Sequence, residues 1–112
     1  MALSSKTTGE TQIITVDAAR IDAAMAIQFK EDMRTQTADG AGRIILDLSA
    51  VEFIDSSGLG AIVASMKQLG NGRRLELAGL QPVVAKVFRL TRMDTVFKLH
   101  PNLDGALASE LE

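Results

Sequence analysis

The stretch that decides the fold is Asp47-Leu-Ser-Ala-Val-Glu-Phe-Ile-Asp55-Ser-Ser-Gly-Leu-Gly60. The apolar run that leads into it, Arg43–Leu48, is typical of a strand that is covered on both faces. Apolar residues after it recur at helical spacing and predict a helix that begins near Ser56 and ends near Leu69. The stretch is therefore a strand-to-helix junction. In sheets built this way, function gathers at the carboxyl ends of the strands, which directs attention to these residues.

On both sides of this junction, strands and helices alternate. The expected elements before it are a strand at Gln12–Val16, a candidate partner strand at Leu3–Thr8, and an amphipathic helix over 22–37 with Asp22 as its N-cap. Those after it are a strand at Leu75–Ala78, a helix that starts at Pro82, a brief strand at Val96–Leu99, and a last helix from Leu103 to Leu111. This order predicts an α/β fold with a mostly parallel or mixed sheet and a central strand at Arg43–Leu48.

Length and composition fit one folded domain over residues 1–112, in which residues 1–10 form either a flexible lead or an edge strand. The residues are 46% hydrophobic and 23% charged, which argues against disorder. A net charge of −2 provides no positive field for nucleic acid. No apolar stretch is long enough to span a bilayer, so we expect no membrane insertion. The absence of cysteine suits a reducing compartment, and we expect a cytoplasmic protein.

Three enzymatic interpretations of the junction do not fit its residues. A serine-hydrolase elbow needs a glycine two positions before the serine, together with a histidine base. The residue two positions before Ser56 is Ile54, and the residue two positions before Ser57 is Asp55. The dinucleotide fingerprint lacks its third glycine, where the chain has Val63, and no P-loop sequence occurs. We therefore expect neither enzymatic activity nor a cofactor. The one histidine, His100, is expected to be exposed or to cap a helix, not to bind a metal.

The hydroxyls of Ser56 and Ser57 lie at the predicted helix N-terminus, and two interpretations of them remain open. In one, Asp55-Ser56-Ser57 is only a cap for unpaired N–H groups. In the other, a serine is phosphorylated. The phosphate then adds a charge of about −1.5 to −2 beside Asp55 and Glu52, which weakens the binding of a partner packed on this corner.

Two further expectations concern side-chain positions. The inward stripe of the helix after the serines leaves small residues on the other side, over which a partner backbone could pass: Gly60, Ala61, Ala64 and Ser65. The four phenylalanines lie on apolar stripes and are expected in the core: Phe29, Phe53, Phe88 and Phe97.

The run Asp47-Leu-Ser-x-Val-x-Phe-Ile-Asp55-Ser-Ser-Gly-Leu-Gly60 resembles the signature of STAS domains, specifically that of the bacterial anti-sigma factor antagonists. The order of elements agrees from about Gln12 to Leu111. The resemblance implies a small sheet of four to five strands with helices packed mainly on one side. It places the family's phosphorylated serine at Ser56, with Ser57 as an alternative. The partner-binding residues that it implies are Asp22, Asp55, Ser57, Gly58, Leu59 and Gly60.

The resemblance also implies partners. In that family, a serine kinase that is also the anti-sigma factor phosphorylates this serine, and a metal-dependent serine phosphatase restores it. The unmodified chain would then bind the anti-sigma factor/serine kinase and release its sigma factor, while ATP and metal belong to the partners. A rival interpretation is a non-switching STAS accessory subunit of a membrane lipid transporter or another complex, in which the serines are only a cap. The intact Ser-Ser-Gly-Leu-Gly run favours the switch.

One position departs from the family pattern. Members often carry glycine before the segment that leads to the first helix, where this chain has Ala19 followed by Arg20-Ile21-Asp22. Alanine adopts a positive φ less readily than glycine. Either the turn differs here, or its geometry does not require glycine. Because this loop often borders the partner surface in the family, the departure bears on the choice of partner.

Overall fold

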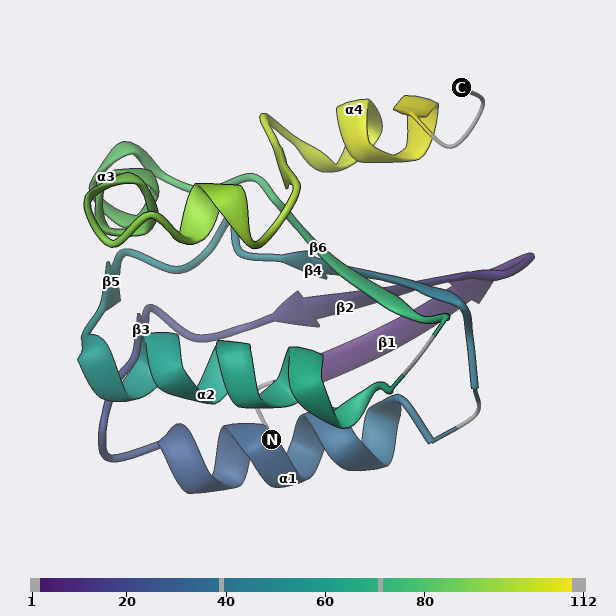
Figure 1. Cartoon of the computed structure of the whole chain (residues 1–112), viewed down its shortest axis with the longest axis horizontal. Coiled ribbons are helices and arrows are strands. Elements are labelled where there is room, and N and C mark those ends of the chain that lie inside the picture. Colours follow the sequence, from purple (N-terminus) through teal and green to yellow (C-terminus); the bar gives the residue numbers. More distant parts are fainter. Residues whose placement is uncertain (1–2, 39, 71, 110–112) are drawn as a thin grey trace.

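The computed structural model describes residues 3–38, 40–70 and 72–109, in which strands alternate with helices (Figure 1). The strands are β1 (Leu3–Thr8), β2 (Thr11–Val16), β3 (Arg20–Ile21), β4 (Arg43–Asp47), β5 (Phe53–Ile54), β6 (Arg74–Ala78) and β7 (Leu99–His100). The helices are α1 (Ala26–Gln36), α2 (Ser56–Gln68), α3 (Pro82–Leu90) and α4 (Leu103–Ala108), with a 3-10 turn at Met93–Thr95.

Five of these strands form one mixed sheet in the order β1-β2-β4-β6-β7. β1 pairs antiparallel with β2, whereas β2, β4, β6 and β7 run parallel. The register places Ile14 beside Leu46, and Leu46 beside Leu77, so one face of three neighbouring strands is apolar. The expected α/β fold is confirmed, with β4 as the central parallel strand and Leu3–Thr8 as an antiparallel edge strand.

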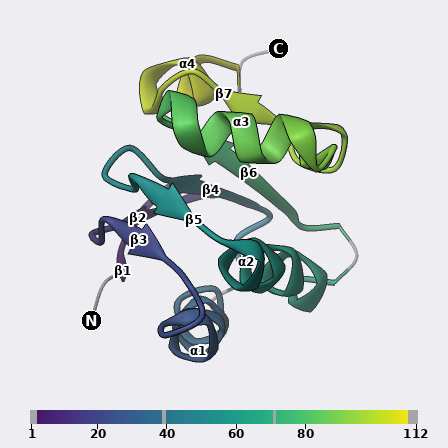
Figure 2. The same ribbon diagram turned by 90° about the vertical axis from the view of Figure 1, so that its left-hand side faces the viewer.

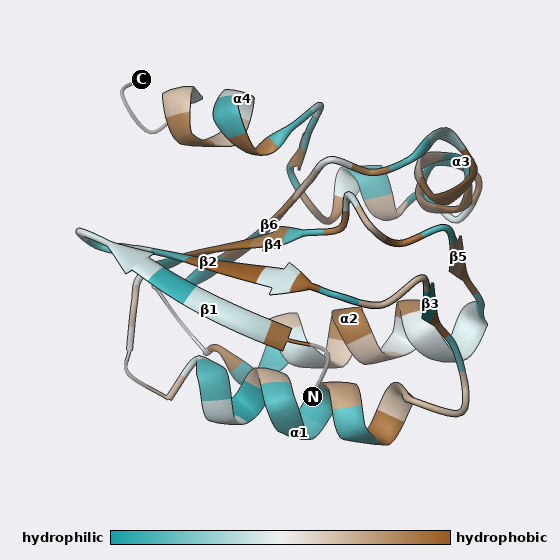
Figure 3. Ribbon diagram, turned by 180° about the vertical axis from the view of Figure 1, so that it is seen from behind, coloured by the Kyte–Doolittle hydropathy of each residue, from teal (hydrophilic) through white to brown (hydrophobic). Residues whose placement is uncertain are grey.

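The main core lies between the apolar face of the sheet and the two longest helices. α1 and α2 lie side by side on this face (Figure 2), and Phe29, Met33 and Ile62 contribute fully buried side chains. α3 adds Val84 and Phe88 to the same core. In Figure 3 the central strands are brown, as expected for strands that are buried on both faces.

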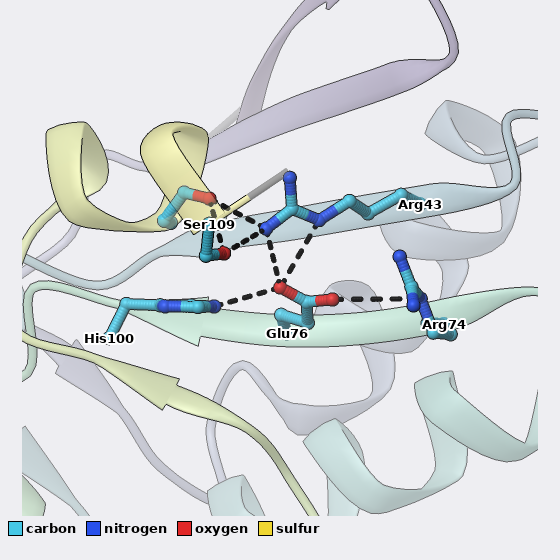
Figure 4. A network of polar contacts seen from close by, with 6 residues as sticks. Arg43, Arg74, Glu76, His100 and Ser109 are labelled. Atoms are coloured by element: carbon cyan, nitrogen blue, oxygen red, sulfur yellow. Dashed lines mark hydrogen bonds and ion pairs between the residues drawn. The ribbon is translucent and has the colours of Figure 1, made fainter. Parts of the chain in front are cut away.

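The opposite face of the sheet carries a second, smaller apolar cluster under α4. Ile45 and Ala78 pack there against Ala106, and all three are fully buried. Beside them Glu76 accepts hydrogen bonds from the Arg43 guanidinium at 2.8 Å and lies 2.8 Å from Nε2 of His100 (Figure 4). Arg43 also donates to the carbonyl of Ala106 at 2.6 Å, which ties α4 to the sheet.

His100 therefore corrects the expectation of an exposed or capping imidazole. It is 7% exposed and belongs to this buried network, because β7 places it beside Ala78 on the face that α4 covers. Burial raises the pKa of Glu76, but hydrogen bonds from Arg43 and His100 outweigh that effect and leave the pKa below its ordinary value. Glu76 is thus a carboxylate at neutral pH.

Two predicted boundaries are wrong, each because a local turn replaces regular structure. α1 begins at Ala26, not at Asp22, because the Asp22 carboxylate accepts the N–H of Ala24 at 3.1 Å and closes a turn before the helix. The strand expected at 96–99 is displaced to Leu99–His100. The chain before it continues from the 3-10 turn as a further turn, in which the N–H of Phe97 donates to the carbonyl of Met93 at 2.9 Å.

At the ends of the chain, Leu111, expected in the last helix, lies outside the described residues, and so do residues 1–2 of the expected lead. In the parts of the chain that the structure describes, no helix combines the length and apolar character needed to cross a bilayer.

Candidate functional site

The strand-to-helix junction is held by a short parallel ribbon that the sequence did not reveal. β3 and β5 pair in parallel (Figure 2), and their register places Ile21 beside Ile54. The carbonyl of Ala19 accepts the N–H groups of Glu52 and Phe53 at 2.7 and 3.1 Å, and that of Ile21 accepts the N–H of Asp55 at 3.3 Å. The segments around residues 20 and 54 therefore form one corner.

The backbone at Ala19 decides whether the turn at this position needs the glycine that members of the family often carry. In the described residues, the one non-glycine residue with a positive φ is Arg92, so the backbone at Ala19 lies in a region that any residue adopts. What this position supplies is a carbonyl that accepts two hydrogen bonds, and alanine provides that as well as glycine does. The turn geometry does not require glycine here.

Asp55 is the N-cap of α2, with extended backbone angles of −106° and −177° for φ and ψ. Its Oδ1 accepts the N–H of Gly58 at 2.8 Å. Its Oδ2 accepts the N–H of Ala23 at 3.2 Å, from the loop between β3 and α1. One half-buried carboxylate thus joins the start of the helix to the neighbouring loop, and a cap of this kind stabilises a helix by about 1 kcal/mol.

Gly58 is buried where α2 passes over β3. A Cβ atom added there would lie 2.0 Å from the carbonyl oxygen of Ile21, closer than real Cβ contacts allow. Gly60, one position past the half-buried Leu59, is exposed, and a Cβ atom there would meet nothing within 4 Å. Packing therefore requires the first glycine of the motif and not the second.

Ser56 and Ser57 are the first two residues of α2, and both are exposed. Among the described residues, neither hydroxyl has a hydrogen-bond partner, since the capping bond comes from Asp55. Their N–H groups belong to the first turn, where a helix has no internal acceptors. The corner thus presents two free hydroxyls next to backbone donors that favour a negative charge.

Asp22 lies on the loop beside these serines, half-buried, and accepts the N–H of Ala24 as well as Nε of Arg20 at 3.3 Å. The Arg20 guanidinium carbon lies 4.1 Å from the ring centre of Phe53.

Phe53 is 36% exposed, so the expectation that it lies in the core is wrong. β5 has its other residue, Ile54, turned into the core, which leaves Phe53 on the outer face.

The face of α2 that was expected to be free for a partner is partly covered. Ala61 and Ser65 are each 2% exposed, because α2 packs against α1 as well as against the sheet. Small side chains allow two helices to approach closely. Gly60 is exposed and Ala64 half-buried, so the open part of the motif is confined to the first turn.

The structure brings the sequence-predicted site residues together. Asp22 is among them, but it closes a turn before α1 and is not the N-cap of that helix. Asp22, Asp55, Ser56, Ser57, Gly58, Leu59 and Gly60 lie on the loop after β3 and on the N-terminal end of α2. Within the described residues, no group of three or more histidine, aspartate or glutamate side chains is arranged to hold a metal ion.

Comparisons with known proteins agree with this architecture. The profile of the STAS domain matches residues 2–106, so the chain belongs to the STAS domain family. It is 30% identical over 87 residues to the anti-sigma-F factor antagonist RsfB of Mycobacterium tuberculosis, covering 78% of this chain and 71% of RsfB.

Two solved structures extend the likeness. An anti-sigma factor antagonist from Mycobacterium paratuberculosis superimposes with a TM-score of 0.87 at 27% identity, covering 98% of this chain and 93% of that one. The anti-sigma factor antagonist SpoIIAA, in its unphosphorylated form, gives a TM-score of 0.61 at 28% identity, covering 80% of this chain and 83% of that one.

Proposed function

We propose that this chain is an anti-sigma factor antagonist that acts by partner switching. In its unphosphorylated form it binds an anti-sigma factor that is also a serine kinase, and so releases a sigma factor. Phosphorylation of Ser56 ends that binding, and a metal-dependent serine phosphatase restores it. The chain itself is the substrate and binding module, not an enzyme.

The observation that carries this proposal is the state of the two hydroxyls on α2. A kinase needs a serine that is exposed and not already engaged. Ser56 and Ser57 meet this condition, while the flanking Asp55 and Gly58 fix the backbone on either side. A residue that served only to cap the helix would have its oxygen bonded to a backbone N–H, and here Asp55 fills that role.

The surroundings of Ser56 explain why a phosphate would act on the partner more than on the fold. The N–H groups of the first helical turn stabilise an anion, so α2 tolerates the modification. A partner that covers the corner must remove water from a group carrying a charge of about −1.5 to −2, next to Asp55 and Glu52. Ile27 and Phe53, 75% and 36% exposed, lie on elements that flank the corner and offer apolar area to such a partner.

The relatives support the same class of function. All three of the proteins described above are named as anti-sigma factor antagonists, and SpoIIAA has been solved in an unphosphorylated and a phosphorylated form. The 30% identical relative, RsfB, is an antagonist of an anti-sigma-F factor.

The test begins with the partner. The tagged chain is recovered from its own cells, and the proteins bound to it are identified by mass spectrometry. We expect a protein with a kinase domain, which phosphorylates the purified chain when ATP is added, with the phosphate on Ser56. Recovery of a transporter ATPase without a kinase would favour the accessory-subunit alternative.

Three variants then separate the roles of the hydroxyls. Ser56→Ala should bind the kinase as well as the unmodified chain but accept no phosphate, and Ser56→Asp should bind at least about tenfold less tightly, as charge burial demands. Ser57→Ala is the matched control for the modification and should still accept phosphate on Ser56. Phosphate on Ser57 alone would move the site by one residue, and phosphate on neither serine would refute the switch.

A further inference from the structure

The first half of β6 has an open edge on the side away from β4. β7 is two residues long and pairs only with Leu77 and Ala78. Successive N–H groups of a parallel strand point to alternate neighbours. That of Arg74 donates to Gly42 on the β4 side, and that of Leu77 donates to Lys98 on the β7 side. The N–H of Leu75 therefore points outward at the open edge, with no acceptor among the described residues.

A pocket of about 450 Å³ opens at this edge. This volume falls within the range of pockets that hold small molecules. Among the described residues, its polar lining includes four cationic side chains and a single carboxylate: Arg43, Arg73, Arg74, Lys98 and Glu76. Its apolar lining includes Met66, which is half-buried, and Val96, which is 45% exposed.

Among the described residues that line the pocket, the cations outnumber the carboxylates. Glu76 is already engaged by Arg43 and His100 inside the protein (Figure 4). The side chain of Arg74 is 69% exposed and approaches the second carboxylate oxygen of Glu76 only to 3.6 Å. Lys98 is exposed and forms no ion pair with another described residue.

Arg73 adds a further cation to the pocket, and it forms no ion pair with another described residue. Its guanidinium donates to the backbone carbonyls of Ala41 and Thr37 at 2.8 and 2.7 Å. These acceptors are neutral, so they fix the position of the guanidinium without cancelling its charge. The pocket thus combines a fixed cation, two adjustable cations and an outward N–H.

We propose that this pocket binds a small organic anion, an oxyanion group attached to an apolar body. Arg74 and Lys98 neutralise the oxyanion, and the N–H of Leu75 donates to it. The apolar body lies against Met66 and Val96. Carboxylates and phosphates share this chemistry, because each group presents two or more negatively charged oxygens that a guanidinium can bind.

The pocket is separate from the serine corner. It lies at the amino-terminal end of β6, whereas Ser56 follows the carboxyl end of β4, and these strands are parallel. The two sites therefore occupy opposite ends of the sheet. Ligand binding at this pocket goes beyond the partner switch and does not depend on it.

The test is a titration of the ¹⁵N-labelled chain followed by amide NMR shifts. The probes are phenyl phosphate, benzoate, inorganic phosphate and benzyl alcohol. We expect saturable shifts at Leu75 and Lys98 with the first two probes. Inorganic phosphate, which lacks the apolar body, and benzyl alcohol, which lacks the charge, should bind at least about tenfold more weakly. The ratio of phenyl phosphate to benzoate affinity tells which oxyanion the pocket prefers.

Variants fix the site. Arg74→Gln and Lys98→Gln should each weaken binding of the preferred probe by about tenfold, because each removes a charge-assisted contact. Arg89→Gln on α3, an exposed cation outside the pocket, is the matched control and should leave affinity unchanged. The proposal is overturned if no saturable shift occurs at Leu75. It is overturned equally if the pocket variants bind like the control, or if benzyl alcohol or inorganic phosphate binds as tightly as the aromatic anions.

Discussion

Asp55 and Glu76 are carboxylates that organise opposite parts of the molecule, and they do so with different partners. Asp55, half-buried at the corner, accepts two backbone N–H groups, from Gly58 and Ala23. Glu76, 5% exposed, is held by the charged side chain of Arg43 and by His100. Because the donors to Asp55 are neutral, one phosphate on a neighbouring serine changes the net charge of the corner strongly. In the interior each charge depends on its partner, so the network is suited to stability and not to switching.

The largest effect on stability is expected from Glu76→Gln. It removes the charge that compensates the buried Arg43, and breaking a buried pair from one side costs about 3 to 5 kcal/mol of unfolding free energy. Urea denaturation at neutral pH measures the loss. Glu31→Gln is the control, since Glu31 pairs with Arg34 in full contact with solvent and should unfold like the unmodified chain. Equal losses for the two variants would contradict the contrast.

The same carboxylate predicts a pH dependence. The pKa of Glu76 is lower in the folded chain than its ordinary value, so the folded state holds its proton less tightly than the unfolded state does. Its stabilising contribution is complete above the ordinary glutamate pKa of about 4.3 and declines as the pH falls through the lower, folded value. The difference in unfolding free energy between the unmodified chain and Glu76→Gln should shrink over that acidic range. A constant difference would show that ionisation of Glu76 is not its source.

At the corner, Gly58→Ala should cost about 1 to 3 kcal/mol or more, because a Cβ atom would collide with the backbone of Ile21. Gly60→Ala is the matched substitution two residues along the same helix. It meets open space and should stabilise α2 slightly, by up to about 1 kcal/mol. Urea denaturation of the two variants measures this difference. Equal stabilities would contradict the close packing of α2 on the backbone of β3.

Loss of the cap should have a smaller effect. Asp55→Ala leaves the N–H groups of Gly58 and Ala23 without their acceptor and should lower the unfolding free energy by about 1 to 2 kcal/mol. Asp17→Ala removes an exposed carboxylate that has no hydrogen bond to another described residue, and it should change little. A cost of Asp55→Ala as large as that of Glu76→Gln would mean that the corner is not built from weaker, neutral contacts.

The smallest effect is expected at the serines. Ser56→Ala and Ser57→Ala should each stay within about 0.5 kcal/mol of the unmodified chain, because both hydroxyls are exposed and unbonded. Thermal unfolding is sufficient to measure this. A clear loss of stability for Ser56→Ala would show that the hydroxyl has a structural role, which would weaken the case for a switch.

The two regions also differ in how far the sequence predicts them. Asp55 and Gly58 are three residues apart, so the cap could be inferred from local spacing alone. Glu76 lies 33 residues from Arg43 and 24 from His100, and pairing them requires the strand register. Charged residues inside apolar strands were the available signal. The β3–β5 ribbon escapes prediction for a different reason, because two-residue strands have no hydrophobic period to detect.

β1 has a consequence for the behaviour of many copies in solution. It is the outer strand of the sheet (Figure 3). Five of its six residues are exposed. Its sequence, Leu-Ser-Ser-Lys-Thr-Thr, offers one apolar side chain, and that side chain is buried. An edge strand with a lysine and short polar residues is a poor template for strand pairing between molecules. In a concentrated solution of this chain, the β1 edge thus disfavours aggregation by extension of the sheet on that side.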